Sequence, residues 1–232
     1  MSAAQDPNIP DFCDVLVIGG GPAGLAAALS TPSTLNVVVV ERRELPSRKA
    51  CDGILTPTTV RTLGTLGINP ATDLGGLPLP TMQVIDRDND RTWQVPLSGH
   101  LGVNRLGLDD CLRRRFLARP GAVFLEQTRA LGFTTSVAGH RLELLRAGQR
   151  ASIRTRHLVD ATGALSWSRR RTGQAGPCAV ALQACYPAQG PCPRFDWIFD
   201  RSATPYYLWA IHTGEDLKLG GVFPLRAGRH GW

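Results

Sequence analysis

Three glycines near the N-terminus have the spacing of a phosphate-binding turn. Gly19, Gly21 and Gly24 form a G-x-G-x-x-G pattern within the run GGGPAG. Gly19 permits a tight turn, Gly21 lets backbone N–H groups approach a pyrophosphate, and Gly24 lets a helix pack closely on a strand. A helix that begins there also presents free N–H groups and a partial positive charge to the phosphates. The pattern therefore favours dinucleotide binding.

The flanking segments have the composition that such a site needs. Residues 13–18 are typical of a buried strand, residues 24–30 of a helix with small and apolar side chains, and residues 36–41 of a second buried strand. That strand ends at Glu41, 17 positions after Gly24. An acid about 20 residues downstream accepts hydrogen bonds from a ribose. The complete strand–loop–helix–strand–acid unit predicts a dinucleotide far more specifically than the glycines alone.

Composition and charge limit the class of protein. The chain has 232 residues, is 43% hydrophobic and holds 25 Gly and 17 Pro, which is typical of a globular α/β protein with many turns. The net charge of +7 comes mainly from arginine. A basic balance can indicate nucleic acid, an anionic membrane or an acidic partner, but no zinc spacing or RNA-binding aromatic motif supports a nucleic-acid partner. We attribute the charge to solvated helix faces and phosphate ligands.

Two further patterns bear on the expected compartment. No window approaches the about 18 apolar residues of a membrane span, and the first ten residues lack the basic start and apolar core of a signal peptide. None of the six cysteines forms C-x-x-C, and no histidine completes a metal site. They are Cys13, Cys51, Cys111, Cys178, Cys185 and Cys192. We expect a cytoplasmic protein with free thiols, no metal and no transmembrane segment.

The remaining chain alternates between α/β and β-rich patterns. A capped helix is expected from Thr56 to Gly67, then a Gly/Pro-rich connector over 70–80. Further expected elements are strands at 81–86 and 92–96, a basic helix at 108–117, strands at 122–125, 133–137, 140–145 and 152–160, and four β-like runs between 179 and 223. The sequence thus predicts a Rossmann-like α/β domain interleaved with a β-rich substrate domain. We expect the first to comprise residues 11–80 and 100–172, and the second 81–99 and 173–232.

Four later segments carry motif-like patterns. They are residues 49–57 (KACDGILTP), 105–112 (RLGLDDCL), 159–169 (VDATGALSWSR) and 207–212 (YLWAIH). Together with the glycine unit, they resemble the flavoprotein superfamily with the fold of para-hydroxybenzoate hydroxylase. That superfamily includes class A flavin monooxygenases, flavin-dependent halogenases and geranylgeranyl reductases. The resemblance covers most of the chain.

The resemblance implies a set of FAD-binding residues. Glu41 would hold the adenosine ribose, Arg105 would lie on the flavin side of the cofactor, and Gly163 would let the backbone approach it. The full set of cofactor candidates is Gly19, Gly21, Pro22, Ala23, Gly24, Glu41, Arg42, Arg105, Asp160 and Gly163. Thr162 stands where the family usually has an acid, so an acidic contact there to the pyrophosphate region or to NAD(P)H is not implied.

The resemblance also implies a catalytic wall and a substrate cavity. Residues 49–57 are similar to the K-x-C-G-G-x-L-x-P segment that passes beside the flavin, with Asp52 in place of a glycine, so Cys51 and Asp52 are the catalytic candidates. Tyr207 and Trp209 match parts of the aromatic motifs of geranylgeranyl reductases and tryptophan halogenases, with His212 in place of proline. These two aromatics are the candidate substrate-binding residues.

Several functions follow from this resemblance. We expect a flavin monooxygenase that uses O₂ and NAD(P)H to hydroxylate an indole or phenol, free or peptidyl, as in tryptophylquinone-forming relatives. Alternatives are a geranylgeranyl-type alkene reductase, a halogenase with an incomplete W-x-W-x-I-P signature, and a non-catalytic flavin-binding chain. The last is suggested because the family's Gly-Asp-Ala motif does not follow residue 224. A C-terminal part of the fold would then be missing, and a second chain could complete it.

Overall fold

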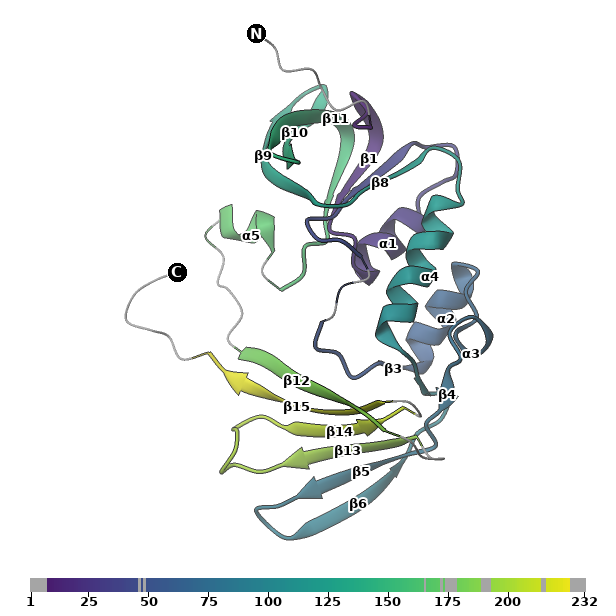
Figure 1. Cartoon of the computed structure of the whole chain (residues 1–232), viewed down its shortest axis with the longest axis vertical. Helices are drawn as coiled ribbons and strands as arrows, with labels where there is room; N and C mark the ends of the chain where they lie inside the picture. The colour runs from purple at the N-terminus through teal and green to yellow at the C-terminus, as the bar shows by residue number, and fades with distance from the viewer. Residues whose placement is uncertain are drawn as a thin grey trace. The chain divides into compact units, whose positions relative to one another are not determined.

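The computed structural model describes residues 8–45, 47, 49–164, 166–171, 173, 179–188, 193–213 and 216–225. The chain divides into two compact units, each built from two separate stretches. The first unit comprises Met1–Ser47 with Leu108–Gly176, and the second comprises Arg48–Gly107 with Pro177–Trp232. Each unit contains one six-stranded sheet (Figure 1). The predicted α/β class is confirmed.

The sheet of the first unit is mixed, with its parallel strands on one side. Its order is β8 (Ala122–Leu125), β2 (Val37–Val40), β1 (Phe12–Ile18), β11 (Gln149–Asp160), β10 (Gly139–Arg146) and β9 (Thr128–Ser136). The first four strands run parallel, whereas β10 and β9 form an antiparallel extension. The register pairs Ile18 with both Val40 and Asp160, so these strands end at one edge. Ligands of parallel α/β sheets bind at such an edge.

Burial explains why β2 consists entirely of valine. All four of its residues are at most 1% exposed, which is expected for a parallel strand covered on both faces. Helix α1 (Pro22–Leu29) packs against β1 and β2. Helix α4 (Arg105–Leu117) places Phe116 edge-on against Phe124 of β8, with ring centroids 6.3 Å apart. The short α5 (Trp167–Arg171) follows β11.

Arg119, just after α4, ties down the end of α1. Its guanidinium donates to the carbonyls of Ala28, Thr31, Pro32 and Leu35 at 2.6–3.1 Å. The last carbonyls of a helix have no intrahelical donor and carry partial negative charge. Arg119 therefore satisfies the end of α1 and the following loop with a single cation.

The sheet of the second unit is largely antiparallel. Its order is β12 (Ala179–Pro187), β15 (Asp216–Pro224), β14 (Leu208–His212), β13 (Arg194–Phe199), β5 (Thr81–Asp86) and β6 (Arg91–Pro96). Only β13 and β5 pair in parallel. The predicted 81–86 and 92–96 strands are confirmed as a hairpin. A small sheet of β3 (Ile54–Leu55), β7 (Leu101–Gly102) and β4 (Leu77–Pro78) accompanies it.

The chain between 48 and 80 departs from expectation in two ways. Residues 48–80 and 100–107, expected in the first domain, lie in the second unit, and Lys218 of its main sheet donates to the Asp52 carbonyl. Within this stretch, β3 and β4 both pair with β7, and Leu79 donates its N–H to the His100 carbonyl. The connector expected over 70–80 was wrong, since it contains α3 (Pro70–Asp73) and β4. Asn69 caps α3 by accepting from the Ala71 N–H. The helix expected at Thr56 is confirmed as α2 (Pro57–Thr65).

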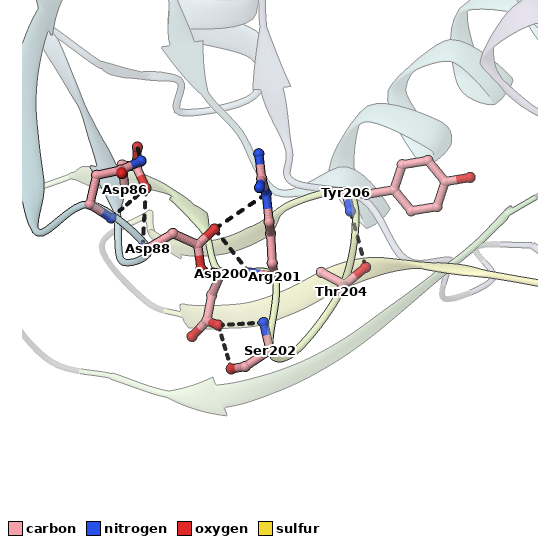
Figure 2. Close-up of polar contacts among 8 residues, drawn as sticks. Asp86, Asp88, Asp200, Arg201, Ser202, Thr204 and Tyr206 are labelled. Atoms are coloured by element: carbon pink, nitrogen blue, oxygen red, sulfur yellow. Dashed lines mark hydrogen bonds and ion pairs between the residues drawn. The ribbon is translucent and has the colours of Figure 1, made fainter.

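Two loops at one end of the second sheet are linked by an ion pair and hydrogen bonds (Figure 2). Asp88, in the β5–β6 turn, pairs with Arg201 and accepts its N–H. Asp200 accepts from Ser202, and hydrogen bonding from that residue lowers the pKa of Asp200. The buried Thr204 donates to the Val222 carbonyl and accepts from the Tyr206 N–H. This polar network links the β13–β14 connection to the neighbouring hairpin and to β15.

Candidate functional site

The glycine loop lies at the carboxyl edge of β1 and requires glycine at two positions. Gly19 has φ +107°, and a Cβ there would lie 2.4 Å from the Ala161 carbonyl oxygen. A Cβ on Gly24 would lie 1.9 Å from the Gly19 oxygen. The Gly19 N–H donates to Val40, and the Ala161 N–H donates to Ile18. The turn is therefore bonded to both strands that flank β1.

The start of α1 has the properties of an anion site. Gly21 is the N-cap residue in an extended conformation, and no side chain caps the helix. The first intrahelical bond runs from the Leu25 N–H to the Gly21 carbonyl, so the N–H groups of Ala23 and Gly24 precede it. Pro22 begins the helix, and its first turn contains no acidic side chain. A pyrophosphate fits this end because it would accept from free N–H groups in a positive local field.

Glu41 braces the loop from the end of β2. Its side chain is buried, and its carboxylate accepts from the Gly20 N–H at 2.8 Å and the Arg43 N–H at 3.0 Å. A Cβ on Gly20 would lie 2.6 Å from the Phe124 ring, so a larger residue there would displace that ring. A carboxylate has about four acceptor positions, so Glu41 retains capacity for a ribose hydroxyl. Bracing is a role that the spacing of residues did not reveal.

Asp160, at the end of β11, organises the segment after it. Its Oδ1 accepts from the Thr162 N–H and hydroxyl at 3.0 and 2.6 Å, and its Oδ2 accepts from the Ser166 hydroxyl and the Ser168 N–H at 2.9 and 2.8 Å. Burial raises the pKa of this carboxyl, but the hydrogen bonds from Ser168 and Thr162 outweigh it and hold the pKa well below its usual range. Asp160 is therefore an ionised structural hub.

The other cofactor candidates differ in their surroundings. Gly163 has φ +81°, is exposed, and has no atom near the position of a Cβ, so a ligand could approach its backbone. Arg42 is exposed and follows Glu41 directly. Arg105 begins α4 in the second unit, whereas the rest of the cofactor candidates lie in the first. Their roles toward a cofactor stay predictions.

A cavity of about 180 Å³ lies in the second unit. It is lined by Ala50, Cys51, Asp52, Ala181, Phe195, Trp197, Tyr207, Trp209, Ile211 and Val222. The structure thus brings together Cys51 and Asp52 with Tyr207 and Trp209, the catalytic and substrate-binding candidates. Sequence analysis missed Phe195 and Trp197, although their spacing of two residues in a strand places them on one face.

The aromatic wall is a continuous row of rings. Centroid distances are 5.8 Å for Phe195–Trp197, 5.2 Å for Trp197–Tyr207 and 6.1 Å for Tyr207–Trp209, each pair edge-on or tilted. The Trp209 indole N–H donates to Gln183. Gly220, paired with Trp209 across the sheet, provides the space for the indole, because a Cβ there would lie 2.4 Å from the ring. Such a wall suits a planar apolar ligand.

The polar end of the cavity is formed by the Cys51–Asp52 pair. Asp52 Oδ1 accepts from the Ile54 N–H at 3.1 Å and lies 3.7 Å from Cys51 Sγ. Cys51 is half-buried and Asp52 is exposed. The carboxylate thus stabilises a turn in its own segment, and because Asp52 is exposed, it can also accept from a ligand N–H or O–H.

Four of the six cysteines lie among the described residues. Cys13, Cys51, Cys111 and Cys185 form no disulfide within the described residues, whereas Cys178 and Cys192 lie outside them. Burial raises the pKa of Cys13 to about 11, which keeps this core thiol protonated. Over the described ranges, no group of three metal-ligating side chains is present, and no helix is long and apolar enough to cross a membrane.

Comparison with known proteins identifies the family. Residues 12–183 match the model of the FAD binding domain family, so the chain belongs to that family. The fold is that of the flavoproteins related to para-hydroxybenzoate hydroxylase, as the resemblance predicted.

Individual relatives are more distant. Protein CbrA of Escherichia coli (strain K12) is 26% identical over 224 residues, which cover 93% of this chain and 62% of the relative. A geranylgeranyl bacteriochlorophyll reductase-like protein from Thermoplasma acidophilum superposes with TM-score 0.75 at 18% identity, covering 95% of this chain and 58% of the other. The flavin-dependent brominase Bmp2, as a triple mutant, gives 0.74 at 23% identity, with 91% and 57% covered. The chain thus spans less than two thirds of these relatives.

Proposed function

We propose that this protein is an FAD-dependent monooxygenase acting on an aromatic substrate. FAD, when bound, would supply the redox chemistry with O₂ and with electrons from NAD(P)H. The observation that carries the proposal is the aromatic row over the Cys51–Asp52 pair in one cavity. Membership of the family supports FAD as the cofactor, and the aromatic lining of the cavity supports an aromatic substrate.

The first unit would bind and orient the cofactor. The free N–H groups at the start of α1 would bind the pyrophosphate, and Glu41 would accept from the adenosine ribose. Asp160 would hold the backbone up to Gly163 in place through its bonds to Thr162 and Ser168. None of these residues needs to transfer a proton.

The second unit would select the substrate. A cavity of about 180 Å³ is smaller than the roughly 300–1,000 Å³ typical of ligand sites, which favours one compact ring system or the side chain of a peptide. The aromatic wall would orient an indole or phenol and exclude water from it. Asp52 would accept the ring N–H or O–H, which increases the electron density of the ring.

The decisive test combines a spectrum with a turnover assay. The purified chain is expected to show a flavin spectrum, to release FAD on denaturation, and to consume O₂ faster when indoles or phenols are added with NADH or NADPH. Asp52→Asn should lower the substrate-stimulated rate more than the unstimulated rate. The proposal fails if FAD binds and no aromatic compound stimulates oxygen uptake.

A second candidate is an alkene reductase, which the position of Cys51 on the cavity wall favours. With reduced FAD as the hydride donor, such an enzyme should reduce an isolated prenyl double bond anaerobically, and Cys51→Ala should abolish that reduction. A monooxygenase should retain most of its rate in the same variant. If flavin binds and neither reaction occurs, a non-catalytic flavin-binding chain becomes the better description.

A further inference from the structure

Lys218, on β15, is a buried cation in an unusual setting. Its side chain is 5% exposed, and its Nζ donates to the Asp52 carbonyl at 3.2 Å. Within the part of the chain that the structure describes, no carboxylate forms an ion pair with it. Lys49, the only other lysine of the sequence, is exposed in the same segment as Asp52.

The burial of the Lys218 ammonium is energetically unfavourable by itself. Burying a charge costs free energy unless polar partners compensate for the lost water, whereas methionine or leucine would fill similar space without that cost. Among the described residues, the compensating partner is the Asp52 backbone carbonyl. Lys218 is therefore better explained by what its contact does to the Asp52 segment than by packing alone.

The segment contacted by Lys218 contains a glycine in a left-handed backbone conformation. Gly53 has φ +78° and is buried, and its carbonyl accepts from the Val103 N–H at 2.8 Å. A Cβ on Gly53 would lie 2.4 Å from the Val103 oxygen and 2.7 Å from Lys218 Nζ. The turn at Asp52–Gly53 is thus held from the Val103 side and from the Lys218 side.

The same segment forms one wall of the cavity. Cys51 and Asp52 line it, as do Ile211 and Val222 on the sheet. Lys218 pairs with Ile211 across the sheet and lies four residues before Val222 on the same strand. Paired residues, and residues an even number apart in a strand, share one face of a sheet, so Lys218 lies on the cavity face. Its side chain spans from this face to the Asp52 carbonyl.

We propose that Lys218 is a positioning residue that holds the Cys51–Asp52 wall against the sheet and thereby maintains the cavity. Its effect on catalysis would rest on the proposed function, whereas its effect on the wall would not. Removing the ammonium should let the Cys51 segment open, which exposes the half-buried thiol. The structural and functional consequences can therefore be measured separately.

The test measures alkylation of Cys51 by iodoacetamide, resolved by peptide mass spectrometry on the full chain. In the Lys218→Met variant, Cys51 should be alkylated about tenfold faster than in the wild type, because the segment loses a hydrogen bond from a charged donor. Labelling of the core thiol Cys13 should not change. Lys49→Met, which removes the exposed lysine of the same segment, is the matched control and should match the wild type.

A second variant distinguishes tethering from general loosening. Lys218→Gln retains an N–H donor without the charge and should restore much of the Cys51 protection. Equal labelling of Cys51 in wild type and Lys218→Met would overturn the proposal, as would faster labelling of Cys13 and Cys51 together. If Lys218→Met does not fold, reaction of the native protein with an amine reagent decides, since Lys218 reacting as fast as Lys49 contradicts a buried tether.

The activity readout then separates this proposal from the preceding one. If aromatic-stimulated oxygen uptake exists, Lys218→Met should raise KM more than it lowers kcat, because the wall of the substrate cavity is displaced. If no such activity exists, the proposed function fails while the alkylation result still tests the tether.

Discussion

The glycine loop and the aromatic cavity are two sites built on different principles. The contacts of the loop are mostly between backbone atoms, such as the Gly19 and Ala161 N–H groups and the Gly19 carbonyl, which lies against Gly24. The cavity is assembled from side chains of distant segments, including Cys51, Trp197 and Trp209. A backbone-defined site should fail abruptly on substitution, whereas a side-chain-defined site should change in steps.

The largest effect is expected from Gly24→Ala. Its Cβ would lie 1.9 Å from the Gly19 oxygen, so the helix and loop must separate, at a cost of about 3 kcal/mol in the free energy of unfolding and with loss of FAD. Denaturant titration and flavin content measure both. Gly64→Ala is the control: no atom lies within 4 Å of its Cβ, and alanine should stabilise helix α2 by about 0.5–1 kcal/mol. Retained FAD in Gly24→Ala would contradict a backbone-defined site.

Arg119→Ala extends the comparison to the far end of α1. Four carbonyl oxygens would lose a charged donor, so we expect a loss of about 2 kcal/mol in unfolding free energy. Burial lowers the pKa of Arg119, but the group stays charged, so the loss should not depend on pH between 6 and 9. Arg114→Ala, which removes an exposed pair with Asp110, should cost under about 0.5 kcal/mol in the same titration. Similar losses of unfolding free energy in the two variants would contradict the stabilisation of the end of α1 by Arg119.

Asp160→Asn tests the ionised hub by its pH dependence. The pKa of Asp160 is lowered in the folded protein, so its stabilising effect is present above the unfolded pKa of about 3.9 and is lost as pH falls through the lower folded value. An asparagine amide would also face the Ser166 and Ser168 donors, which should cost about 1–2 kcal/mol at pH 7. The stability gap between variant and wild type should shrink below pH 4. A gap that stays constant down to pH 2 would show that Asp160 does not act through its charge.

The smallest effect is expected from Tyr207→Phe in the cavity. The ring row would remain, so unfolding free energy should change by under about 0.5 kcal/mol and FAD content should not change. Stimulation of oxygen uptake should shift among indoles and phenols, because one hydroxyl near the substrate is gone. Loss of FAD in this variant would break the distinction between the two sites.

Local patterns predicted the glycine loop and its flanking strands and helix because most of their determinants lie close together in the chain. The valines of β2, the glycines and the acid at position 41 each report on their immediate surroundings. What they did not reveal is that the Glu41 carboxylate braces Gly20, or that the Phe124 ring packs 2.6 Å from where a Cβ on Gly20 would lie. The second of these contacts depends on strand β8, which arrives more than 80 residues after β2.

The second site was predicted only as separate candidates. Cys51 with Asp52, and Tyr207 with Trp209, were proposed from a family resemblance, and nothing in their spacing placed them in one cavity. Residues 48–80 were assigned to the wrong side of the division because short strands such as β3 and β4 take their place from a partner, β7, rather than from their own composition.

The order of residues by itself determined the turn at Gly19, the start of α1 at Pro22 and the valine strand, because backbone freedom, helix capping and continuous burial are properties of neighbouring residues. Only the tertiary structure decided that Gly220 makes room for Trp209, that Phe195 and Trp197 complete the aromatic wall, and that Lys218 reaches the Asp52 carbonyl. These contacts join strands whose register is set by the whole sheet, so no local pattern could specify them.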